Sequence, residues 1–536
     1  MDEVQVNLES QATEPPQNIR QPAFSPGWRF YIAFSSLSVI ALMAALDATS
    51  ISVALRIMAK LLRGSAIEAF WAGTSFLLTS AVFQPVLGSF SNVFGRKPMV
   101  VLSLAFFGVG ATVAAVAGNF TVILVGRSIQ GIGGGGIIVM TGVVITDLVP
   151  LRERGKWFSA ISSMWALGTV FGPLLGGVFA ENVSWRWIFW INLPFIGVGL
   201  PLVIFFLKLH LKPSSFLHKL RHIDWFGVAV FVLSLTGLLV PITWGGVMYS
   251  WSSWRTLVPL IVCAVAMVCF IVYEDRYATN PLIQTRVFKN RTAASTFAQT
   301  LLHGLVLWSE LYYTPLYYEA VKGYSPVLAG VALFPQTFTV APAAIAIGFA
   351  IAHTGRYRWA LWSGWSLTTL GLGLIVYLDV DTSVPSWIFL NLAPGLGTGI
   401  LFPTMSIAVQ AASRACDQAA AVTMFAFLRA LGQTLGVAIG GVVFQNQVRQ
   451  KLQTYPSLAL DAIALSKDAS GLVEVIKKMP AYSPEKALLQ AAYVSGLRRV
   501  WIIICFVKGL PLDQALATEQ GFREEQDVND AEKQRA

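Results

Sequence analysis

The stretch ILVGRSIQGIGGGGIIVM, from Ile123 to Met140, admits two incompatible interpretations. Gly131, Gly133 and Gly136 spell GxGxxG, the phosphate-cradling pattern of dinucleotide-binding enzymes. Arg127 stands in the same apolar run, where a charge would be costly if the segment were a helix in lipid. The fold therefore depends on whether this stretch is a cofactor loop or part of a membrane-spanning helix.

The composition of the chain favours the membrane. Its 536 residues are 55% hydrophobic and only 12% charged, about half the charged fraction of soluble domains. Apolar stretches of about 20 residues recur, each long enough to cross about 30 Å of hydrocarbon as a helix. GxGxxG also requires a short preceding strand and an acidic residue about 20 positions later, whereas these glycines lie inside one long apolar segment. We therefore expect an all-α polytopic membrane protein.

The charges of the loops predict the orientation. Fourteen apolar segments follow one another, the last of them short. With the N-terminus inside, the short inner loops carry sixteen lysines and arginines and the short outer loops carry six. Because these residues concentrate in cytoplasmic loops, the bias predicts a cytoplasmic N-terminus. It also accounts for the net charge of +10 without a nucleic-acid partner.

The sequence repeats itself at a nearly constant offset. Gly88–Lys97 is similar to Gly348–Tyr357, 260 residues later, and ALGTVFGPLLGGVF from Ala166 is similar to ALGQTLGVAIGGVV from Ala430, 264 residues later. Two parallel six-helix halves with an extra helix pair between them explain this, and such repeats place a substrate site between the halves. The predicted parts are a disordered cytoplasmic tail (1–29), an N-terminal half (30–207), a linker with two extra helices (208–274), a C-terminal half (275–507) that includes a long extracellular loop (446–499), and a polar tail (508–536).

Several sequence motifs, including the arginine-containing stretch around Arg127 and the repeated glycine pattern from Ala166, resemble those of the major facilitator superfamily. They are most similar to its fourteen-span drug:proton antiporter branch, as found in fungi. LVGRSIQGIG (124–133) is similar to the helix-four motif with its arginine, and GTVFGPLLGG (168–177) to the antiporter motif of helix five. WRWIFWINLP from Trp185 and YEAVKGYSP from Tyr318 are also similar to this branch. The resemblance covers nearly the whole chain and implies the major facilitator fold. Because fungal relatives are often exporters of drugs or secondary metabolites, it implies efflux without naming a cargo.

Four intramembrane charges are candidates for proton coupling. Arg127 lies about 10 Å into its helix from Phe120, so it must either snorkel to the outer interface or pair with an acid. Asp47 lies towards the same side on the first helix, and a proton on Asp47 would release a paired arginine. The resemblance implies proton coupling for this arginine. Glu310, 263 residues after Asp47, is either its counterpart or an interior acid without a coupling role, and Arg429 is the fourth charge.

Glycines and a basic loop are candidates for gating. Glycines at helical spacing let another backbone approach closely, and Pro173 can kink its helix. They indicate either ordinary close packing or, as the resemblance implies, a contact that biases alternating access. The residues assigned to gating and helix packing are Gly88, Asn92, Gly95, Arg96, Lys97, Gly131, Gly168, Gly172, Pro173, Gly176 and Gly177.

The loop after the second helix departs from the family pattern at one position. The family normally carries an acid where this chain has Asn92. Asparagine forms hydrogen bonds but no ion pair. The departure predicts a weaker lock on the outward-facing state or slower turnover.

Aromatic residues and sequons complete the candidate sites. Five aromatic residues either stack with a flat apolar cargo or face lipid and its interface: Trp308, Tyr312, Tyr313, Tyr317 and Phe425. Asn119 and Asn182 stand in N-x-[ST] sequons on very short predicted outer loops, so we expect glycosylation at one or neither. Asn290, in another sequon, lies on the predicted inner side and should stay unmodified.

The last apolar segment is too short to span a membrane. Val500–Val507 has eight residues, about 12 Å as a helix, against about 30 Å of hydrocarbon. Extending the helix backwards meets Arg498 and Arg499, and extending it forwards meets Lys508. We therefore predict thirteen full spans and a truncated last helix, with about a dozen apolar residues missing after Ile504.

The expected function is proton-coupled export of amphipathic small molecules by a multi-pass protein of the plasma membrane. Proton-coupled uptake, for instance of siderophores, is the alternative within transport, and a non-transporting sensor or defective product is the alternative from another class. Enzyme activity is not expected, because metal-type spacing, a nucleophile–base constellation and the ATP motif GxxxxGK[ST] are absent from the sequence. The expected partners are the cargo, protons and lipid; no cofactor, metal or nucleic acid is expected, and the protein should be a monomer.

Overall fold

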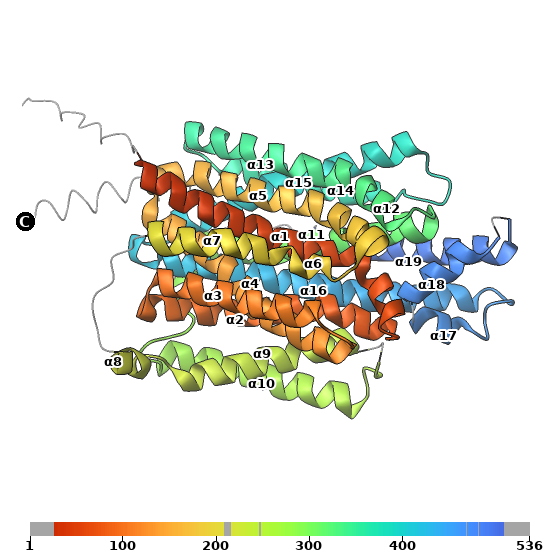
Figure 1. The fold of residues 1–536 in the computed structure, drawn as a ribbon, viewed down its shortest axis with the longest axis horizontal. Coiled ribbons are helices and arrows are strands. Elements are labelled where there is room, and N and C mark those ends of the chain that lie inside the picture. The colour runs from red at the N-terminus through yellow and green to blue at the C-terminus, as the bar shows by residue number, and fades with distance from the viewer. Residues whose placement is uncertain (1–25, 208–215, 246–247, 468, 481, 509–536) are drawn as a thin grey trace, which may run out of the picture.

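A computed structural model describes residues 26–207, 216–245, 248–467, 469–480 and 482–508. Long helices lying side by side dominate it (Figure 1). The helices are α1 (Trp28–Leu61), α2 (Ala66–Phe94), α3 (Arg96–Ala115), α4 (Phe120–Leu148), α5 (Leu151–Val178), the π-helix η1 (Phe179–Val183), α6 (Trp187–Trp190), α7 (Asn192–Phe206), α8 (Phe216–Arg221), α9 (Trp225–Trp244), α10 (Trp254–Arg276), the 3₁₀-helix η2 (Thr285–Phe288), α11 (Arg291–Leu316), the π-helix η3 (Tyr317–Val321), α12 (Pro326–Ala332), α13 (Phe334–Thr354), α14 (Arg358–Ile375), α15 (Val384–Ala411), the 3₁₀-helix η4 (Ala415–Asp417), α16 (Gln418–Gln453), α17 (Ala462–Lys467), α18 (Ala469–Lys478) and α19 (Pro484–Lys508).

Several helices begin or end at local signals in the sequence. Ser65 Oγ accepts a hydrogen bond from the Glu68 amide at 3.2 Å, and the Glu68 carboxylate accepts one from the Ser65 amide at 2.8 Å. This capping box starts α2. At the other end of α2, Gly95 has a φ of 99°, which glycine adopts without the steric cost of a side chain, and α3 follows immediately.

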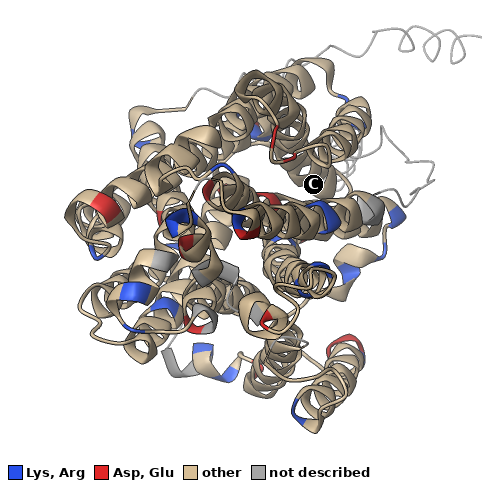
Figure 2. Cartoon of the chain, turned by 90° about the vertical axis from the view of Figure 1, so that its right-hand side faces the viewer, with Lys and Arg blue, Asp and Glu red and all other residues tan. Residues whose placement is uncertain are grey.

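The helices form a multi-pass membrane bundle. Within the described residues, 12 helices are long and apolar enough to cross a membrane. The amphipathic α11 and the shorter α14 lie among them and contact α16 and α15, respectively. We call the end of the bundle where α1 begins, at the left of Figure 1, the inner end, because the charge bias predicts that it is cytoplasmic. The opposite end, which carries α17 and α18, is the outer end and faces the viewer in Figure 2.

Helix packing repeats between two halves, as the internal repeat predicts. In the first half α1 packs on α5, and α4 packs on both α2 and α3. In the second half α11 packs on α16, and α15 packs on both α13 and α14. The halves meet where α5 contacts α13 and where α16 contacts α2. The extra pair, α9 and α10, lies on the flank of the bundle against α2 and α16 rather than between the halves (Figure 1).

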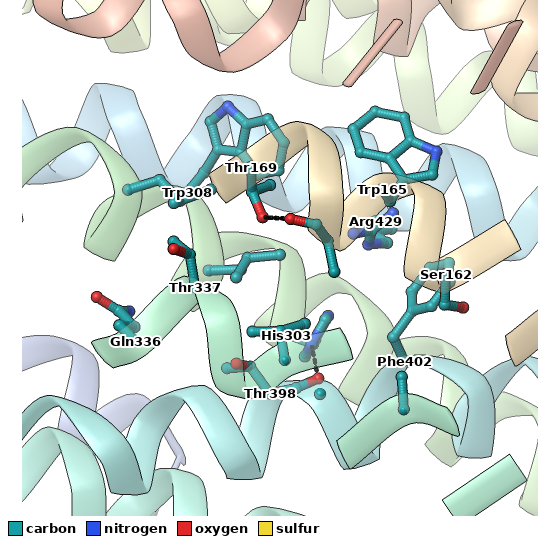
Figure 3. A pocket seen from close by; sticks show the side chains of 16 residues that line it. Ser162, Trp165, Thr169, His303, Trp308, Gln336, Thr337, Thr398, Phe402 and Arg429 are labelled. Atoms are coloured by element: carbon teal, nitrogen blue, oxygen red, sulfur yellow. Dashed lines mark hydrogen bonds between the residues drawn. The ribbon is translucent and has the colours of Figure 1, made fainter. Parts of the chain in front are cut away.

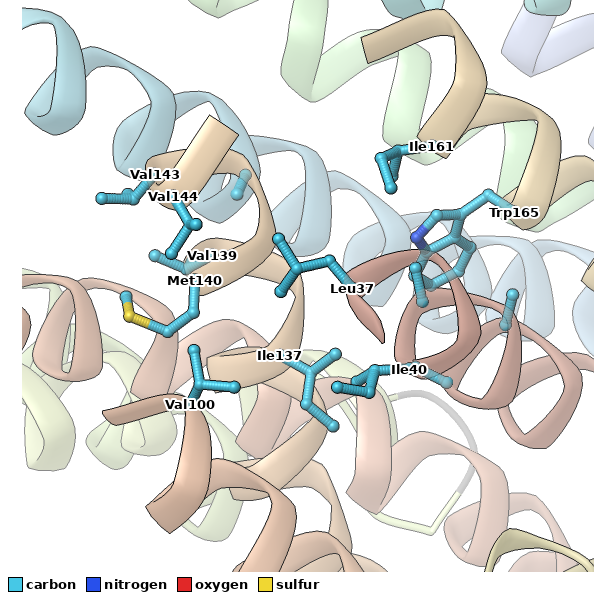
Figure 4. Packing of buried hydrophobic residues seen from close by; sticks show 14 of the residues in the cluster. Leu37, Ile40, Val100, Ile137, Val139, Met140, Val143, Val144, Ile161 and Trp165 are labelled. Atoms are coloured by element: carbon cyan, nitrogen blue, oxygen red, sulfur yellow. The ribbon is translucent and has the colours of Figure 1, made fainter. Parts of the chain in front are cut away.

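Apolar side chains fill the first half. Leu37 and Ile40 of α1 meet Val100 of α3, Ile137 of α4 and Ile161 of α5 in one buried cluster (Figure 4). Burying apolar area contributes about 25 cal/mol per Å² in water, whereas in lipid the close fit itself holds helices together. This cluster therefore fixes α4, and with it Arg127, against its neighbours.

The region from 446 to 499 differs from the long loop predicted for it. The helix α16 continues to Gln453, α17 and α18 follow, and α19 begins at Pro484. The last helix is therefore 25 residues long, not an eight-residue stub. The prediction failed because Arg498 was taken as a helix boundary. In the structure its guanidinium donates to the Val376 carbonyl at 3.0 Å and to the Asp379 carboxylate at 3.1 Å, so the helix accommodates the charge.

Only the final part of α19 runs beside α14. Arg498 lies level with the residues just after α14, whereas the Cys505 thiol lies 3.8 Å from the Thr369 carbonyl, inside α14. From Arg498 to Lys508 a helix advances about 15 Å. The missing apolar segment after Ile504 stays a prediction, and the tail after Lys508 lies outside the described residues.

Candidate functional site

The glycine run of α4 is a packing surface. A Cβ at Gly131 would collide with Phe76 and Thr79 of α2, and one at Gly133 would collide with the backbone of Ser103 and Phe107 on α3. The alternating glycines thus let α4 approach both neighbours closely. This settles the choice posed by the sequence, because the run lies within a continuous helix from Phe120 to Leu148.

Arg127 pairs with Asp47 in the interior of the first half. Its Nη1 donates to Asp47 Oδ2 at 2.6 Å, and both side chains are about 1% exposed. The same nitrogen donates to Gln130 Oε1 at 2.8 Å, and Nε donates to the Ala72 carbonyl at 3.1 Å. The ring of Phe76 covers the guanidinium at 4.3 Å. The arginine is therefore paired rather than snorkelling.

The Asp47 carboxylate is held by three donors. Besides Arg127, Gln130 Nε2 and Asn192 Nδ2 each donate to Oδ1 at 2.8 Å. Such charge-assisted bonds stabilise the ionised carboxylate, and removing one partner of a buried ion pair costs about 3–5 kcal/mol. A proton on Asp47 would cancel its charge and weaken all three contacts at once. The network can therefore exist in two states that differ by one proton.

Gln130 and Asn192 were missed by the sequence analysis. Both are buried, and both are neutral residues within apolar helices. Gln130 stands three residues after Arg127, a spacing that places both on one helical face. That spacing was the available signal for Gln130; nothing in the sequence linked Asn192 on α7 to Asp47.

Glu310 and Arg429 lie on α11 and α16 of the second half, whereas Asp47 and Arg127 lie on α1 and α4 of the first. Glu310 is fully buried on α11 and accepts a hydrogen bond from Gln336 Nε2 of α13 at 2.8 Å. Arg429 on α16 is 7% exposed, with Phe402 at 4.2 Å and Trp165 at 5.7 Å from its guanidinium carbon. The proton-coupling roles of all four residues stay predictions.

A cavity lies between the halves and contains Arg429 (Figure 3). The space open to the centre of a water molecule is about 40 Å³. The wall combines α5 of the first half with α11, α13, α15 and α16 of the second, and its polar side chains include Ser162, Thr337 and Thr398. Thr398 also offers its carbonyl to His303 Nε2 at 3.2 Å.

One of the five predicted cavity aromatics lines this space. Trp308 does so, whereas Tyr312, Tyr313, Tyr317 and Phe425 do not. The Tyr313 hydroxyl donates to the Val437 carbonyl at 2.6 Å, and the Tyr317 hydroxyl donates to the Asp379 carbonyl at 2.7 Å. These two tyrosines thus tie α11 and η3 to neighbouring segments. The cavity aromatics that the sequence analysis missed are Trp165 and Phe402.

The antiporter-like motif forms a close seam between α5 and α1. A Cβ at Gly168, Gly172 or Gly176 would collide with residues 45–50 of α1, and Gly177 instead faces α12. Thr49 Oγ1 donates to the Gly168 carbonyl at 3.0 Å across this seam. Asp47 lies on the same segment of α1, so a change at Asp47 acts directly beside the seam.

The loop between α2 and α3 is held by Arg96. Its Nε donates to Asp147 Oδ2 of α4 at 3.0 Å, and its Nη1 donates to Asn92 Oδ1 and to Ser91 Oγ at 2.6 Å each. Asn92 therefore forms the expected hydrogen bond, and Asp147 supplies an acid that the sequence analysis missed. Lys97 bonds to the Ile204 carbonyl at 2.5 Å, and a Cβ at Gly88 would collide with Thr423 of the second half.

The halves are also joined at the inner end by Arg154, another residue that the sequence analysis missed. Its Nη1 donates to Gln410 Oε1 at 3.3 Å and to Gln418 Oε1, and its Nε donates to the Val149 carbonyl at 2.7 Å. Arg154 belongs to the first half and both glutamines to the second. These bonds must break if the cavity is to open inward.

The sequons occupy different settings. Asn119 is exposed and caps α4 by accepting from the Val122 amide at 3.0 Å, whereas Asn182 is exposed in η1. Asn290 caps α11 at the inner end and donates to the Ala412 carbonyl at 3.1 Å. Within the described residues no three His, Cys, Asp or Glu side chains come together as a metal site requires.

Comparison with known proteins decides the family. The profile of the Major Facilitator Superfamily matches residues 37–441. The chain belongs to the major facilitator superfamily. It is thus a membrane transporter of the class that moves small molecules, not an enzyme.

Relatives and solved structures agree with this membership of the major facilitator superfamily. The chain is 60% identical to the MFS transporter L2 of a Phoma species, over 95% of this chain and 87% of that protein. It is 36% identical to the Acurin A biosynthesis cluster MFS-type transporter of Aspergillus aculeatus, over 93% and 92%, and 34% identical to the efflux pump FUS6 of Gibberella fujikuroi, over 93% and 92%. The fold matches the proton:xylose symporter XylE with a TM-score of 0.55 at 13% identity, covering 86% of this chain and 98% of that one.

Proposed function

We propose that this transporter exports amphipathic small molecules in exchange for protons, from the cytoplasm across the plasma membrane. The observation that carries the proposal is the buried Asp47–Arg127 pair with its two amide partners. Relatives at 33–35% identity named as efflux pumps support the direction of transport. One relative belongs to a biosynthesis cluster, which supports a secondary metabolite as the cargo.

Proton binding at Asp47 would act through α1. The ionised carboxylate fixes α1 to Arg127 and Gln130 of α4. The neutral acid loses the Coulombic part of this attachment, while Arg127 keeps its bond to the Ala72 carbonyl. Thr49 and Ser50 stand two and three residues after Asp47 and form the seam with α5, whose other face lines the cavity. A proton thus biases the position of α5 relative to the second half.

The cavity must widen during transport. Drug-sized ligands occupy pockets of about 300–1,000 Å³, and the space here is about 40 Å³. The halves touch on both sides of it, through Arg154 and Gln410 at the inner end and through Gly177 and Val327 at the outer end. This arrangement corresponds to a closed intermediate of alternating access, which opens when one of these contacts is released.

The test uses the purified full-length chain in liposomes with an imposed pH gradient and two xanthene dyes, fluorescein and rhodamine 123. An antiporter accumulates dye in a lumen that is more acidic than the medium, whichever way the protein is inserted. We expect accumulation of at least one dye by the wild type and none after the gradient is collapsed with nigericin or in Asp47→Asn.

Two outcomes would contradict the proposal. Accumulation only in an alkaline lumen, beyond that of empty liposomes, would indicate symport and hence uptake. Accumulation that is unchanged in Asp47→Asn would remove Asp47 from proton coupling. Equal amounts of folded protein, measured by gel filtration of both variants, are the control.

A further inference from the structure

The guanidinium of Arg429 is a buried cation without an acid beside it. Of the hydrogen bonds and ion pairs within the described residues, none involves this guanidinium, and its Nε is fully buried without a partner. Its neighbours are the faces of Phe402 and Trp165. Arg127, at a similar degree of burial, has one carboxylate and two further acceptors. The two buried arginines therefore differ in whether their charge is neutralised by the protein.

An unpaired buried charge is expensive to maintain. Removing an ion from water costs several kcal/mol even after relaxation, and arginine does not escape by losing its proton. The aromatic faces of Phe402 and Trp165 attract the cation and offset part of this cost. The remaining cost would be offset by a group of opposite charge that binds beside the guanidinium.

The residues that line the cavity indicate the charge of the group that binds there. The residues that line the cavity include Arg429 and no aspartate or glutamate. Arginine presents a planar fork that matches a carboxylate in two parallel hydrogen bonds. The guanidinium lies beneath Trp165 at the edge of the cavity, with Phe402 on another side (Figure 3). The rings leave the NH groups as the polar feature that a ligand meets there.

The rest of the wall favours a ligand with a large apolar part. Trp308, Leu307, Leu311, Val340 and the ring of Phe402 line the cavity together with a few hydroxyl groups. A small hydrophilic anion would leave these surfaces uncovered, whereas a hydrocarbon or aromatic body would bury them.

We propose that the cargo is an amphipathic organic anion, whose carboxylate or similarly delocalised acid group binds the Arg429 guanidinium between Trp165 and Phe402. This inference rests on the proposed function in that it takes the cavity as the cargo site. The internal repeat gives the site its form, because Trp165 and Arg429 are 264 residues apart and so occupy equivalent positions in the two halves. The first half supplies the ring of Trp165, and the second half supplies the charge of Arg429 and the ring of Phe402.

The test measures binding without any gradient, so that it is independent of proton coupling. Fluorescein and rhodamine 123 share a xanthene skeleton and carry opposite charges at neutral pH. Their binding to the purified full-length chain in detergent is followed by fluorescence anisotropy. We expect wild type to prefer fluorescein, and Arg429→Gln to weaken fluorescein binding by about tenfold or more, the effect of about 1.4 kcal/mol. Arg429→Lys should recover part of the affinity, because it restores the charge without the fork.

The control variant is Arg498→Gln, which removes an arginine whose partner Asp379 is exposed at the outer end. It should leave the preference between the dyes unchanged. Tighter binding of rhodamine 123 by the wild type, absence of fluorescein binding, or equal fluorescein affinity in Arg429→Gln would each overturn the anion proposal. Fluorescein binding that depends on Arg429, with no gradient-driven accumulation, would instead overturn proton coupling and leave the anion site standing.

Discussion

The two halves of the molecule share their helix packing and differ in their buried charges. In the first half Asp47 is held by Arg127, Gln130 and Asn192. In the second half the repeat offset assigns Asn391 to the position of Arg127, and Asn391 bonds to the Tyr318 hydroxyl at 3.1 Å. The repeat thus preserved a scaffold and let the charges diverge. Under the two proposals above, proton coupling belongs to the first half, and the charge that binds the cargo belongs to the second.

The largest effect should follow from Arg127→Ala. It leaves the Asp47 carboxylate buried without its cation, a loss of about 3–5 kcal/mol, and gradient-driven dye accumulation should fall below detection. The matched change in the second half is Glu310→Gln, which keeps a carbonyl oxygen to accept from Gln336. It should reduce accumulation by about tenfold or less, the equivalent of about 1.4 kcal/mol.

Transport in the liposome assay distinguishes these variants, with gel filtration as the control for folding. If Glu310→Gln proved as inactive as Arg127→Ala, proton coupling would extend to both halves. Full transport by both Asp47→Asn and Arg127→Ala would show that the first-half network is only structural.

An intermediate and equal effect is expected at the two glycine seams. A Cβ at Gly176 would meet the Ser50 carbonyl of α1, and a Cβ at Gly436 would meet the Leu305 carbonyl of α11. A backbone carbonyl in a packed helix cannot move away from the added Cβ as a flexible side chain can. Gly176→Val and Gly436→Val should therefore each destabilise the protein by about 1–3 kcal/mol. Thermal unfolding in detergent measures the loss.

The control for the seams is Gly373→Val on α14, where a Cβ would meet nothing within 4 Å. It should change stability by no more than about 0.5 kcal/mol. A loss at one seam only would mean that the halves do not share the packing that the repeat predicts.

Two kinds of residue could be predicted from the sequence. They are charges whose burial in an apolar helix is energetically costly, and glycines that recur at helical spacing. Asp47 and Arg127 stood out because a charge in an apolar helix needs a partner, and the glycines stood out by their spacing. Asn192 and Asp147 could not be predicted, because a neutral amide inside a helix and an acid at a helix end are both common. Their roles become visible only when the position of the neighbouring helix is known. The start of α19 was misjudged because Arg498 finds its acceptors on a segment more than a hundred residues away.

The smallest effect should come from Asn92→Asp. Asn92 contacts Arg96 near the surface, and the equivalent position in the second half is Ala352. Arg96 already bonds to Asp147 and to the Asn92 oxygen, so a carboxylate at 92 strengthens an existing hydrogen bond without creating a new one. Partly exposed ion pairs contribute about 0.2–1 kcal/mol, so the initial rate of dye accumulation should rise by about fivefold at most. The matched change is Ala352→Asp, at the equivalent position of the second-half motif, which adds the same charge and should leave the rate unchanged. Because added salt screens exposed charges, the gain in Asn92→Asp should shrink at high ionic strength. A lower rate in Asn92→Asp at equal protein, or the same gain in Ala352→Asp, would show that the loop does not act through Arg96.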